Sequence, residues 1–189
     1  MPQDHGFPLP PDLPVPVDDG AARHLAGIEM PHVTLPSTAG RIVDLGNLSS
    51  PRTVIYCYPR TGVPGEPLPP GWDLIPGARG CTPQTCGFRD HYQQLLARGA
   101  AVFGCSTQTT EYQREMACRL HVPLEVLSDA EFKLRDALNL PTFEVAGVPL
   151  LKRLTLIIRA SRIEHVFYPV FPPDQSAATV LDWLDADPL

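Results

Sequence analysis

The sequence predicts a single α/β domain in which helices flank a central mixed β-sheet. Through the middle of the chain, runs of β-branched and aromatic residues alternate with segments of helical periodicity. A β-hairpin pattern follows late in the chain. The alternation predicts parallel strands, to which the hairpin adds antiparallel ones. The length of 189 residues is that of one domain with a core of its own.

The first half of the chain predicts a hairpin, a buried strand and a long helix. Residues 32–35 and 41–45 have strand character on either side of a turn at 36–40. The β-branched and aromatic run 53–58 is typical of a buried central strand and ends at proline. A helix should begin at Thr82-Pro83, which combines a capping hydroxyl with a first-turn proline, and should end near residue 97.

The second half repeats strand and helix and then closes with a hairpin. Strands are expected at 101–105 and 124–127, helices at 110–120 and 129–138, and a short extended stretch at 143–145. Residues 154–158 and 163–167 should pair across Ala160-Ser161, and 174–184 should form the last helix. The most economical fold for this order is a thioredoxin-like α/β sandwich.

Proline marks two further segments. The chain has 23 prolines, about 12% against an average near 5%. Six fall within residues 2–16, so residues 1–20 are predicted to be an extended tail before a domain at 21–189. Six more fall within 59–76, and residues 60–80 are predicted to be a long loop, ordered as a flap by Leu68 and Trp72.

Composition restricts the partners and the location. The net charge of −6 and the isoelectric point near 5.4 argue against nucleic acid and against an anionic membrane surface. No run of about 18 apolar residues could span a bilayer. Residues 1–20 lack the basic and apolar regions of a secretory signal, so we expect a cytoplasmic protein.

The five cysteines fall into two groups. Cys57, Cys105 and Cys118 lie in apolar or helical patterns and are expected to be small buried side chains. Cys81 and Cys86 lie at a polar, turn-rich helix entry where a thiol should be reachable. There, free backbone N–H groups, the helix dipole and the nearby Arg79 would favour a thiolate, which is the nucleophilic form of cysteine.

Other interpretations of this pair are weaker. Structural zinc permits four residues between two cysteines but needs two further ligands. His91 is near, yet no second Cys/His pair with suitable spacing follows. Two buried structural thiols are the other alternative, which the position of Cys81 after Gly80 makes less natural. The sequence therefore predicts no metal and no cofactor.

At these residues the chain resembles the peroxiredoxins, in particular their bacterioferritin-comigratory or Q-type branch. The most specific match is Gly80-Cys-Thr-Pro-Gln-Thr-Cys-Gly-Phe-Arg-Asp90 at the helix start. Weaker matches occur in the same order as in the family and cover roughly residues 30–186: Tyr56-Cys-Tyr-Pro59, Gly104-Cys-Ser-Thr107, Leu127-Ser-Asp129, Arg153-Leu-Thr-Leu-Ile-Ile158 and Arg162-Ile-Glu-His-Val-Phe167.

The resemblance implies a thioredoxin-like fold with an N-terminal hairpin extension. It also implies a thiol-dependent peroxidase that reduces hydrogen peroxide and organic hydroperoxides. It implies that Cys81 is the peroxidatic cysteine and Cys86 the resolving cysteine, joined as an intramolecular disulfide during turnover. Arg153 matches the active-site arginine and should stabilise the thiolate and the peroxide. Pro59 should form a wall of the pocket. A thioredoxin or similar dithiol would be the reductant, and we expect a monomer or a weak homodimer.

The chain departs from the family before the catalytic cysteine. The motif Pro-x-x-x-Thr-x-x-Cys places proline seven positions before cysteine, whereas Pro59 lies 22 positions before Cys81. The motif threonine would fall at Ala78, whose methyl group makes no hydrogen bond. Thr61 remains close to Pro59, and two alternatives stay open for it: its hydroxyl folds back towards Cys81 as the missing donor, or Thr61 is only a turn residue.

Two other functions remain open. A thiol–disulfide reductase would need a closer Cys-x-x-Cys pair, which this chain lacks. A non-enzymatic redox sensor would signal to a partner through the same disulfide. Peroxide consumption with a thioredoxin system separates both from a peroxidase.

Overall fold

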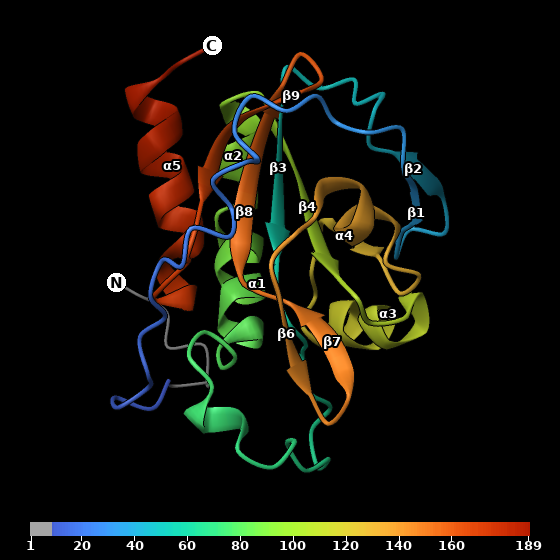
Figure 1. Cartoon of the computed structure of the whole chain (residues 1–189). Coiled ribbons are helices and arrows are strands. Elements are labelled where there is room, and N and C mark those ends of the chain that lie inside the picture. Colours follow the sequence, from blue (N-terminus) through green and yellow to red (C-terminus); the bar gives the residue numbers. More distant parts are fainter. Residues whose placement is uncertain (1–8) are drawn as a thin grey trace.

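The computed structural model describes residues 9–189, and its centre is a five-stranded sheet in the order β5-β4-β3-β8-β9 (Figure 1). The parallel strands are β3 (Arg52–Cys57), β4 (Ala100–Ser106) and β5 (Glu125–Ser128). The antiparallel strands β8 (Leu154–Arg159) and β9 (Arg162–Phe167) complete it. The predicted mixed sheet and thioredoxin-like sandwich are confirmed.

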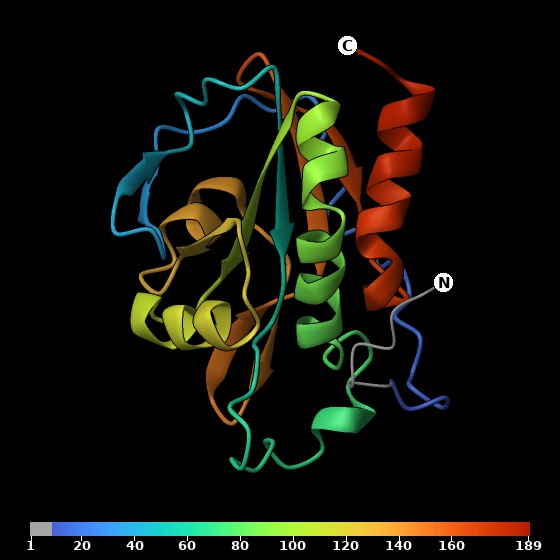
Figure 2. The same cartoon turned by 180° about the vertical axis from the view of Figure 1, so that it is seen from behind.

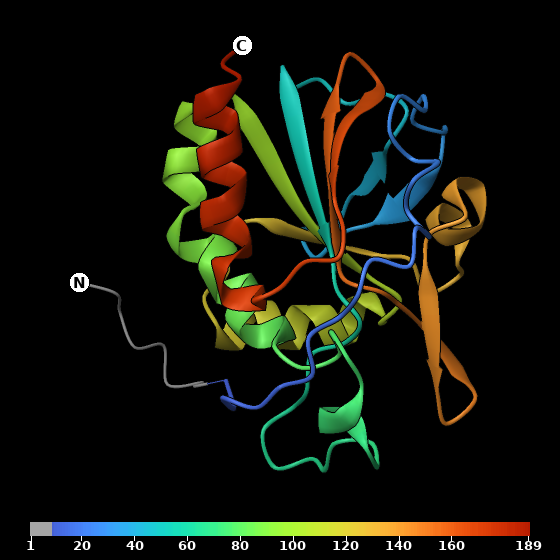
Figure 3. The same cartoon turned by 60° about the vertical axis from the view of Figure 1, so that its left-hand side comes forward.

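Helices cover one face of this sheet, and mixed structure covers the other. The helical face carries α1 (Cys81–Asp90), α2 (Tyr92–Ala97) and α5 (Ser176–Ala186), as Figures 2 and 3 show. The opposite face carries α4 (Lys133–Leu138) and the hairpin of β1 (Thr34–Pro36) and β2 (Ile42–Asp44). The helix α3 (Thr110–Arg119) packs against β5. Each face therefore has its own apolar core.

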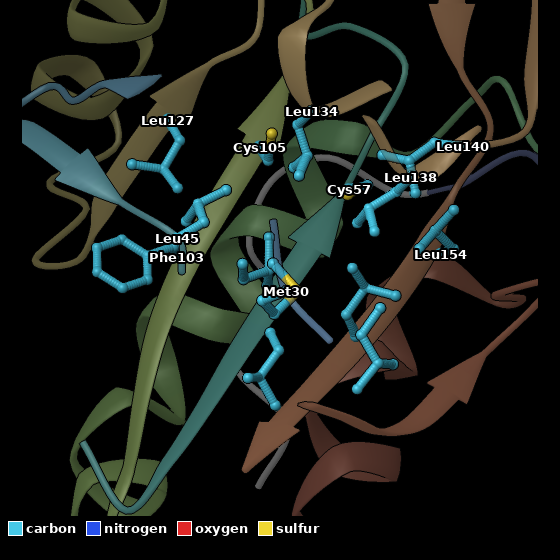
Figure 4. Packing of buried hydrophobic residues seen from close by; sticks show 14 of the residues in the cluster. Met30, Leu45, Cys57, Phe103, Cys105, Leu127, Leu134, Leu138, Leu140 and Leu154 are labelled. Atoms are coloured by element: carbon cyan, nitrogen blue, oxygen red, sulfur yellow. The ribbon is translucent and has the colours of Figure 1, made fainter. Parts of the chain in front are cut away.

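The opposite-face core contains two of the cysteines. Cys57 and Cys105 are fully buried there, at paired positions on β3 and β4 (Figure 4). Both behave as the small apolar side chains that were predicted. Cys118 does not, because the structure exposes it on α3. Its position in a helical pattern did not reveal which side of that helix is buried.

The long helix predicted for 82–97 is two helices. The break is at His91, whose Nδ1 and backbone N–H both lie within hydrogen-bond distance of the Gly87 carbonyl. The helix predicted from 129 begins later, since the Asp129 carboxylate accepts hydrogen bonds from the backbone N–H groups of Leu134 and Arg135. Such side-chain caps fix helix ends that periodicity alone places only roughly.

The strand β7 (Val148–Leu151) was not predicted. It pairs with β6 (Thr142–Val145), which covers the extended stretch predicted at 143–145, and the two form a separate two-stranded hairpin. Pro149 lies within β7, and proline argues against a central strand but is tolerated in an edge strand. The 3-10 helices η1 (Trp72–Leu74) and η2 (Pro173–Gln175) complete the elements.

The inserted segment 60–80 packs beneath the sheet, at the lower end of Figure 1. Trp72 is buried in a small cluster with Ala78 and Leu150, and its ring lies 6.2 Å from that of Phe143. Trp72 is thus the apolar anchor that was predicted, whereas Leu68 is 41% exposed. Of the two predicted anchors, only Trp72 is buried.

The tail contacts the domain where the structure describes it. The Asp19 carboxylate accepts hydrogen bonds from Lys152 Nζ at 2.5 Å and Tyr168 OH at 2.7 Å. Both contacts hold the pKa of Asp19 well below its usual range. Residues 9–18 form no helix or strand, and residues 1–8 of the predicted tail lie outside the described residues.

Candidate active site

The candidate site lies where the inserted segment ends and α1 begins. Cys81 is the first residue of that helix, and Gly80 is its N-cap with a φ of 101°. A Cβ at residue 80 would lie 2.2 Å from Pro173 Cγ and 3.2 Å from Leu9 Cδ2. Glycine is therefore required at this position for both its backbone angle and the close approach. Cys81 therefore occupies the first turn of α1, where the Gln84 N–H donates to the Gly80 carbonyl and Pro83 has no N–H, so the unpaired backbone donors are those of residues 81 and 82.

Arg153 contacts the Cys81 sulfur directly. Its Nη2 lies 3.3 Å from Cys81 Sγ, and both side chains are buried, at 3% and 4% exposure. The Cys81 thiol also lies 3.5 Å from the carbonyl oxygen of Ala78, to which it donates. A thiol can use that acceptor, whereas a thiolate would accept from the guanidinium. The site thus provides a partner for each protonation state.

The Arg153 guanidinium is held by the end of the inserted segment. Nη2 donates to the backbone carbonyls of residues 77, 78 and 79 at 3.2, 3.3 and 3.0 Å. Nη1 donates to Gln84 Oε1, and Gln84 Nε2 donates to Ser176 Oγ at 3.3 Å. Arg153 follows β7 in the chain, so this network joins the β7–β8 connection, the insertion, α1 and α5.

Cys86 is buried deeper, with 1% of its surface exposed. It packs on α1 in the core that contains Tyr56, Tyr58 and Phe88. Burial raises the pKa of the Cys86 thiol, and the positive charges of Arg89 and Arg119 oppose this only in part. In this conformation Cys86 is a protonated thiol without access to solvent, contrary to the reachable thiols predicted for this pair.

The Cys81 sulfur faces a pocket of about 460 Å³. Its lining comes from the start of α1, from the inserted segment and from the tail: Leu9, Arg60, Gly62, Val63, Pro64, Gly65, Glu66, Leu68, Trp72, Ala78, Arg79, Gly80, Cys81, Thr82, Pro83 and Arg119. Arg153 is not part of this lining, although its Nη2 contacts the sulfur. The pocket gives a small molecule a route to Cys81.

Three predicted contributions differ in the structure. The Thr61 hydroxyl donates to Gln108 Oε1 at 3.2 Å, and within the described chain it makes no hydrogen bond with Cys81. Pro59 is buried behind the pocket, whose wall begins instead at Arg60. Arg79 forms an ion pair with Asp73 at 3.0 Å, so its charge is largely neutralised rather than added to the site.

Three residues of this region, Gln84, Gln108 and Arg60, were not among the predicted site residues. Gln84 lies three positions after Cys81, a spacing that puts two side chains on one helix face, and this signal could have identified it. Gln108 exchanges hydrogen bonds with the Thr61 backbone from another strand end. Arg60 had no sequence signal beyond its place after proline. Only the folded chain brings the last two to the insertion.

Across residues 9–189, no three His, Cys, Asp or Glu side chains are grouped as a metal ion would require. No helix in that range is both long and apolar enough to cross a bilayer.

Comparison with known proteins shows to which family this fold and its cysteine site belong. The Redoxin family model matches residues 25–181. Chloroplastic peroxiredoxin Q of Sedum lineare is 30% identical over 158 residues, covering 84% of this chain and 76% of the relative. Peroxiredoxin Bcp of Escherichia coli K12 is 28% identical over 163 residues, covering 84% and 94%.

Solved structures agree on the fold. Peroxidoxin BcpB of Mycobacterium tuberculosis superimposes with a TM-score of 0.70 at 24% identity, covering 87% of this chain and 99% of that one. Peroxiredoxin Q of Xanthomonas campestris gives 0.69 at 20% identity, covering 86% and 98%. The chain belongs to the Redoxin family, as a peroxiredoxin of the Q or bacterioferritin-comigratory type. It is a thiol-dependent peroxidase.

Proposed function

We propose that Cys81 is the peroxidatic cysteine of this peroxidase, Cys86 its resolving cysteine and Arg153 the residue that stabilises the reacting sulfur. The single observation that carries this proposal is the 3.3 Å contact between Arg153 Nη2 and Cys81 Sγ beside the pocket. Among the described cysteines, only Cys81 lines that pocket. A charge-assisted donor and the positive end of a helix both favour the thiolate.

In the first step the Cys81 thiolate attacks one oxygen of the hydroperoxide. The S–O bond forms, the O–O bond breaks, and the departing oxygen takes a proton to leave as water or an alcohol. The sulfur loses two electrons to the peroxide and is thereby oxidised to sulfenic acid. Negative charge develops on the departing oxygen, and the N–H groups of the α1 first turn and the Arg153 guanidinium are the donors nearest to it.

In the second step Cys86 condenses with the sulfenic acid. An S–S bond forms and one water leaves, so the oxidation state of the pair is unchanged. Because Cys86 is buried on the same helix, the start of α1 must unwind before the two sulfurs meet. Exposure to water then removes the burial that raises the pKa of Cys86.

In the third step a thioredoxin-like dithiol reduces the disulfide by thiol exchange, and the partner carries away the oxidising equivalents as its own disulfide. The cytoplasm would supply such a dithiol. The Pro-rich tail at 1–20 and the domain at 21–189 would act as one peroxidase unit, as a monomer or a weak homodimer. No cofactor enters this cycle.

Two cysteine variants test the assignment. Cys81→Ser should abolish peroxide consumption in a thioredoxin-coupled assay, because no other described thiol lines the pocket. Cys86→Ser should still react once and leave a sulfenic acid that dimedone traps at Cys81. Cys118→Ser, which removes the exposed thiol, is the matched control and should behave as wild type. Continued turnover in Cys81→Ser would contradict the proposal.

The same assay separates the two rival functions. A redox sensor would consume one equivalent of peroxide and then stop even with the reductant present. A thiol–disulfide reductase would reduce a protein disulfide without consuming peroxide. Sustained peroxide consumption at sub-stoichiometric protein is the result expected here.

A further inference from the structure

The pocket at Cys81 is larger and more apolar than hydrogen peroxide needs. Its volume of about 460 Å³ is many times the roughly 30 Å³ that a water molecule occupies in the liquid. The apolar part of its wall comes mainly from the inserted segment, with Val63, Leu68 and Trp72, and from Leu9 of the tail. The shape suits a hydroperoxide attached to an apolar body.

Arg60 brings an unpaired positive charge to this wall. Its Nε is buried and has no hydrogen-bond partner, and among residues 9–189 its guanidinium forms no ion pair. The other two arginines of the wall differ in this respect. Arg79 pairs with Asp73 at 3.0 Å, and Arg119 pairs with Glu115 at 2.7 Å. Arg60 therefore has donors that are free for a ligand.

The two Nη groups of Arg60 are not among the buried side-chain atoms, and within residues 9–189 they form no hydrogen bond. Guanidinium donors in a largely apolar pocket favour an acceptor, and an acceptor that arrives with the substrate can bind these two groups. The guanidinium fork fits a carboxylate with two parallel hydrogen bonds. Glu66 also lines the pocket, but it is exposed on the flap and forms no described ion pair with Arg60.

We propose that this pocket selects organic hydroperoxides that carry a carboxylate, and that Arg60 binds the carboxylate while the hydroperoxide group reaches Cys81. The proposal rests on the function assigned above to Cys81. The reaction balances as before: the thiolate takes one oxygen and becomes sulfenic acid, and the substrate leaves as the corresponding hydroxy acid. The carboxylate takes no part in the bond changes and serves only to hold and orient the substrate.

The test uses two substrates that differ only in charge: a medium-chain ω-hydroperoxy carboxylic acid and its methyl ester. The second-order rate of Cys81 oxidation is measured by stopped flow for each, with hydrogen peroxide as a third substrate. The wild type should favour the acid over the ester by about tenfold or more, as expected for a charge-assisted contact. Arg60→Met should reduce this ratio to near one, and Arg60→Lys should retain part of it.

The control is Arg114→Met, which removes the same charge from a residue outside the pocket and should keep the wild-type ratio. Circular dichroism establishes that each variant is folded. A wild type that oxidises equally fast with acid and ester, or a preference that survives in Arg60→Met, overturns the proposal. Failure with all three peroxides would instead overturn the role of Cys81.

Discussion

Arg153 illustrates how one buried side chain can serve both the fold and the chemistry. Its guanidinium binds three successive carbonyls at the end of the insertion and contacts the Cys81 sulfur with the same nitrogen. The carbonyls fix the arginine, and the arginine in turn fixes the backbone that leads into α1. The sulfur therefore meets a donor whose position is set before any peroxide arrives.

Replacing Arg153 by methionine should slow Cys81 oxidation by about tenfold or more, because a hydrogen bond to a charged group contributes about 1.5–3 kcal/mol. Stopped-flow fluorescence with hydrogen peroxide measures the rate. Arg79→Met is the matched control, since that guanidinium is already paired with Asp73, and its rate should stay within about two-fold of wild type. A similar rate for Arg153→Met would assign Arg153 a structural role only. Thermal unfolding of each variant shows whether a slower rate reflects a damaged fold.

Replacing Thr61, in contrast to Arg153, should have little effect on the rate of Cys81 oxidation. Because its hydroxyl is bonded to Gln108, Thr61→Val should leave the rate of Cys81 oxidation within about two-fold of wild type. The lost hydrogen bond should lower the free energy of unfolding by about 0.5–1.5 kcal/mol. Urea unfolding measures the second effect. A large fall in rate with unchanged stability would instead support the role of donor to the peroxide that the sequence suggested.

The residue scale also shows what a sequence can reveal about this site. Cys81, Cys86 and Arg153 could be named because each lies in a short motif with its chemistry in the adjoining residues. The partners of Thr61 and Arg79 could not, because Gln108 lies 47 positions from Thr61, and a loop sequence does not show that Asp73 turns back to Arg79. The empty acceptor position at Arg60 is likewise a property of the folded pocket alone.

The helix α1 sets a geometric limit on the catalytic cycle. Both cysteines lie within it, five residues apart. On an ideal helix this spacing separates the Cα atoms by about 8.6 Å, which follows from the rise, the turn and the radius. A disulfide needs less than about 7 Å. The pair can therefore bond only if the first turn and a half of α1 unwinds.

Amide hydrogen exchange on reduced and oxidised protein tests this requirement. Protection over residues 81–88 should fall on oxidation and return with a thioredoxin reductant, while the strands keep theirs. Cys86→Ser treated with the same peroxide is the control, because it forms no such disulfide and should keep its protection. Unchanged exchange together with a Cys81–Cys86 disulfide found by mass spectrometry would refute the unwinding. A disulfide to Cys57, Cys105 or Cys118 would refute the choice of Cys86.

Elements with strong local signals were predicted well. The buried strand β3, the β8–β9 hairpin and the start of α1 all fall within one residue of their expected positions. Three elements were predicted wrongly, and each difference has a local cause. Pro149 argues against a strand at β7, and side-chain hydrogen bonds shift the start of α4 and divide the predicted long helix at His91. Periodicity reports which face is buried, but not which polar group ends a helix.

At the scale of the whole molecule, segments far apart in the chain meet around Cys81. Leu9 of the tail and Pro173 of η2 approach Gly80, and Trp72 anchors the flap on Phe143 of β6. Pro16 of the tail lies 3.6 Å from where a Cβ of Gly77 would stand. The two proline-rich segments are thus joined to each other as well as to the domain. Together they form most of the wall of the pocket at Cys81.

The buried core around the site also predicts how the protein responds to alkali. Burial raises the pKa of Tyr56, Tyr58 and Cys86, and a hydrogen bond with Cys57 followed by burial raises that of Cys105. In the folded protein these groups keep their protons at a pH where the unfolded chain loses them. Their contribution to stability is complete below the unfolded pKa values and is lost as the pH rises towards the folded ones.

The free energy of unfolding should therefore decline from about pH 8.5, where unfolded cysteine titrates, and more steeply above about pH 10, where unfolded tyrosine does. Urea unfolding of the reduced protein between pH 7 and 11 measures this decline. Tyr58→Phe removes a fully buried phenol and should make the slope above pH 10 shallower, whatever its effect at pH 7. Tyr112→Phe is the control, since Tyr112 lies on α3 outside this core, and its slope should equal that of the wild type. Equal stability at pH 7 and pH 11 would contradict the expectation that these groups stay protonated in the fold.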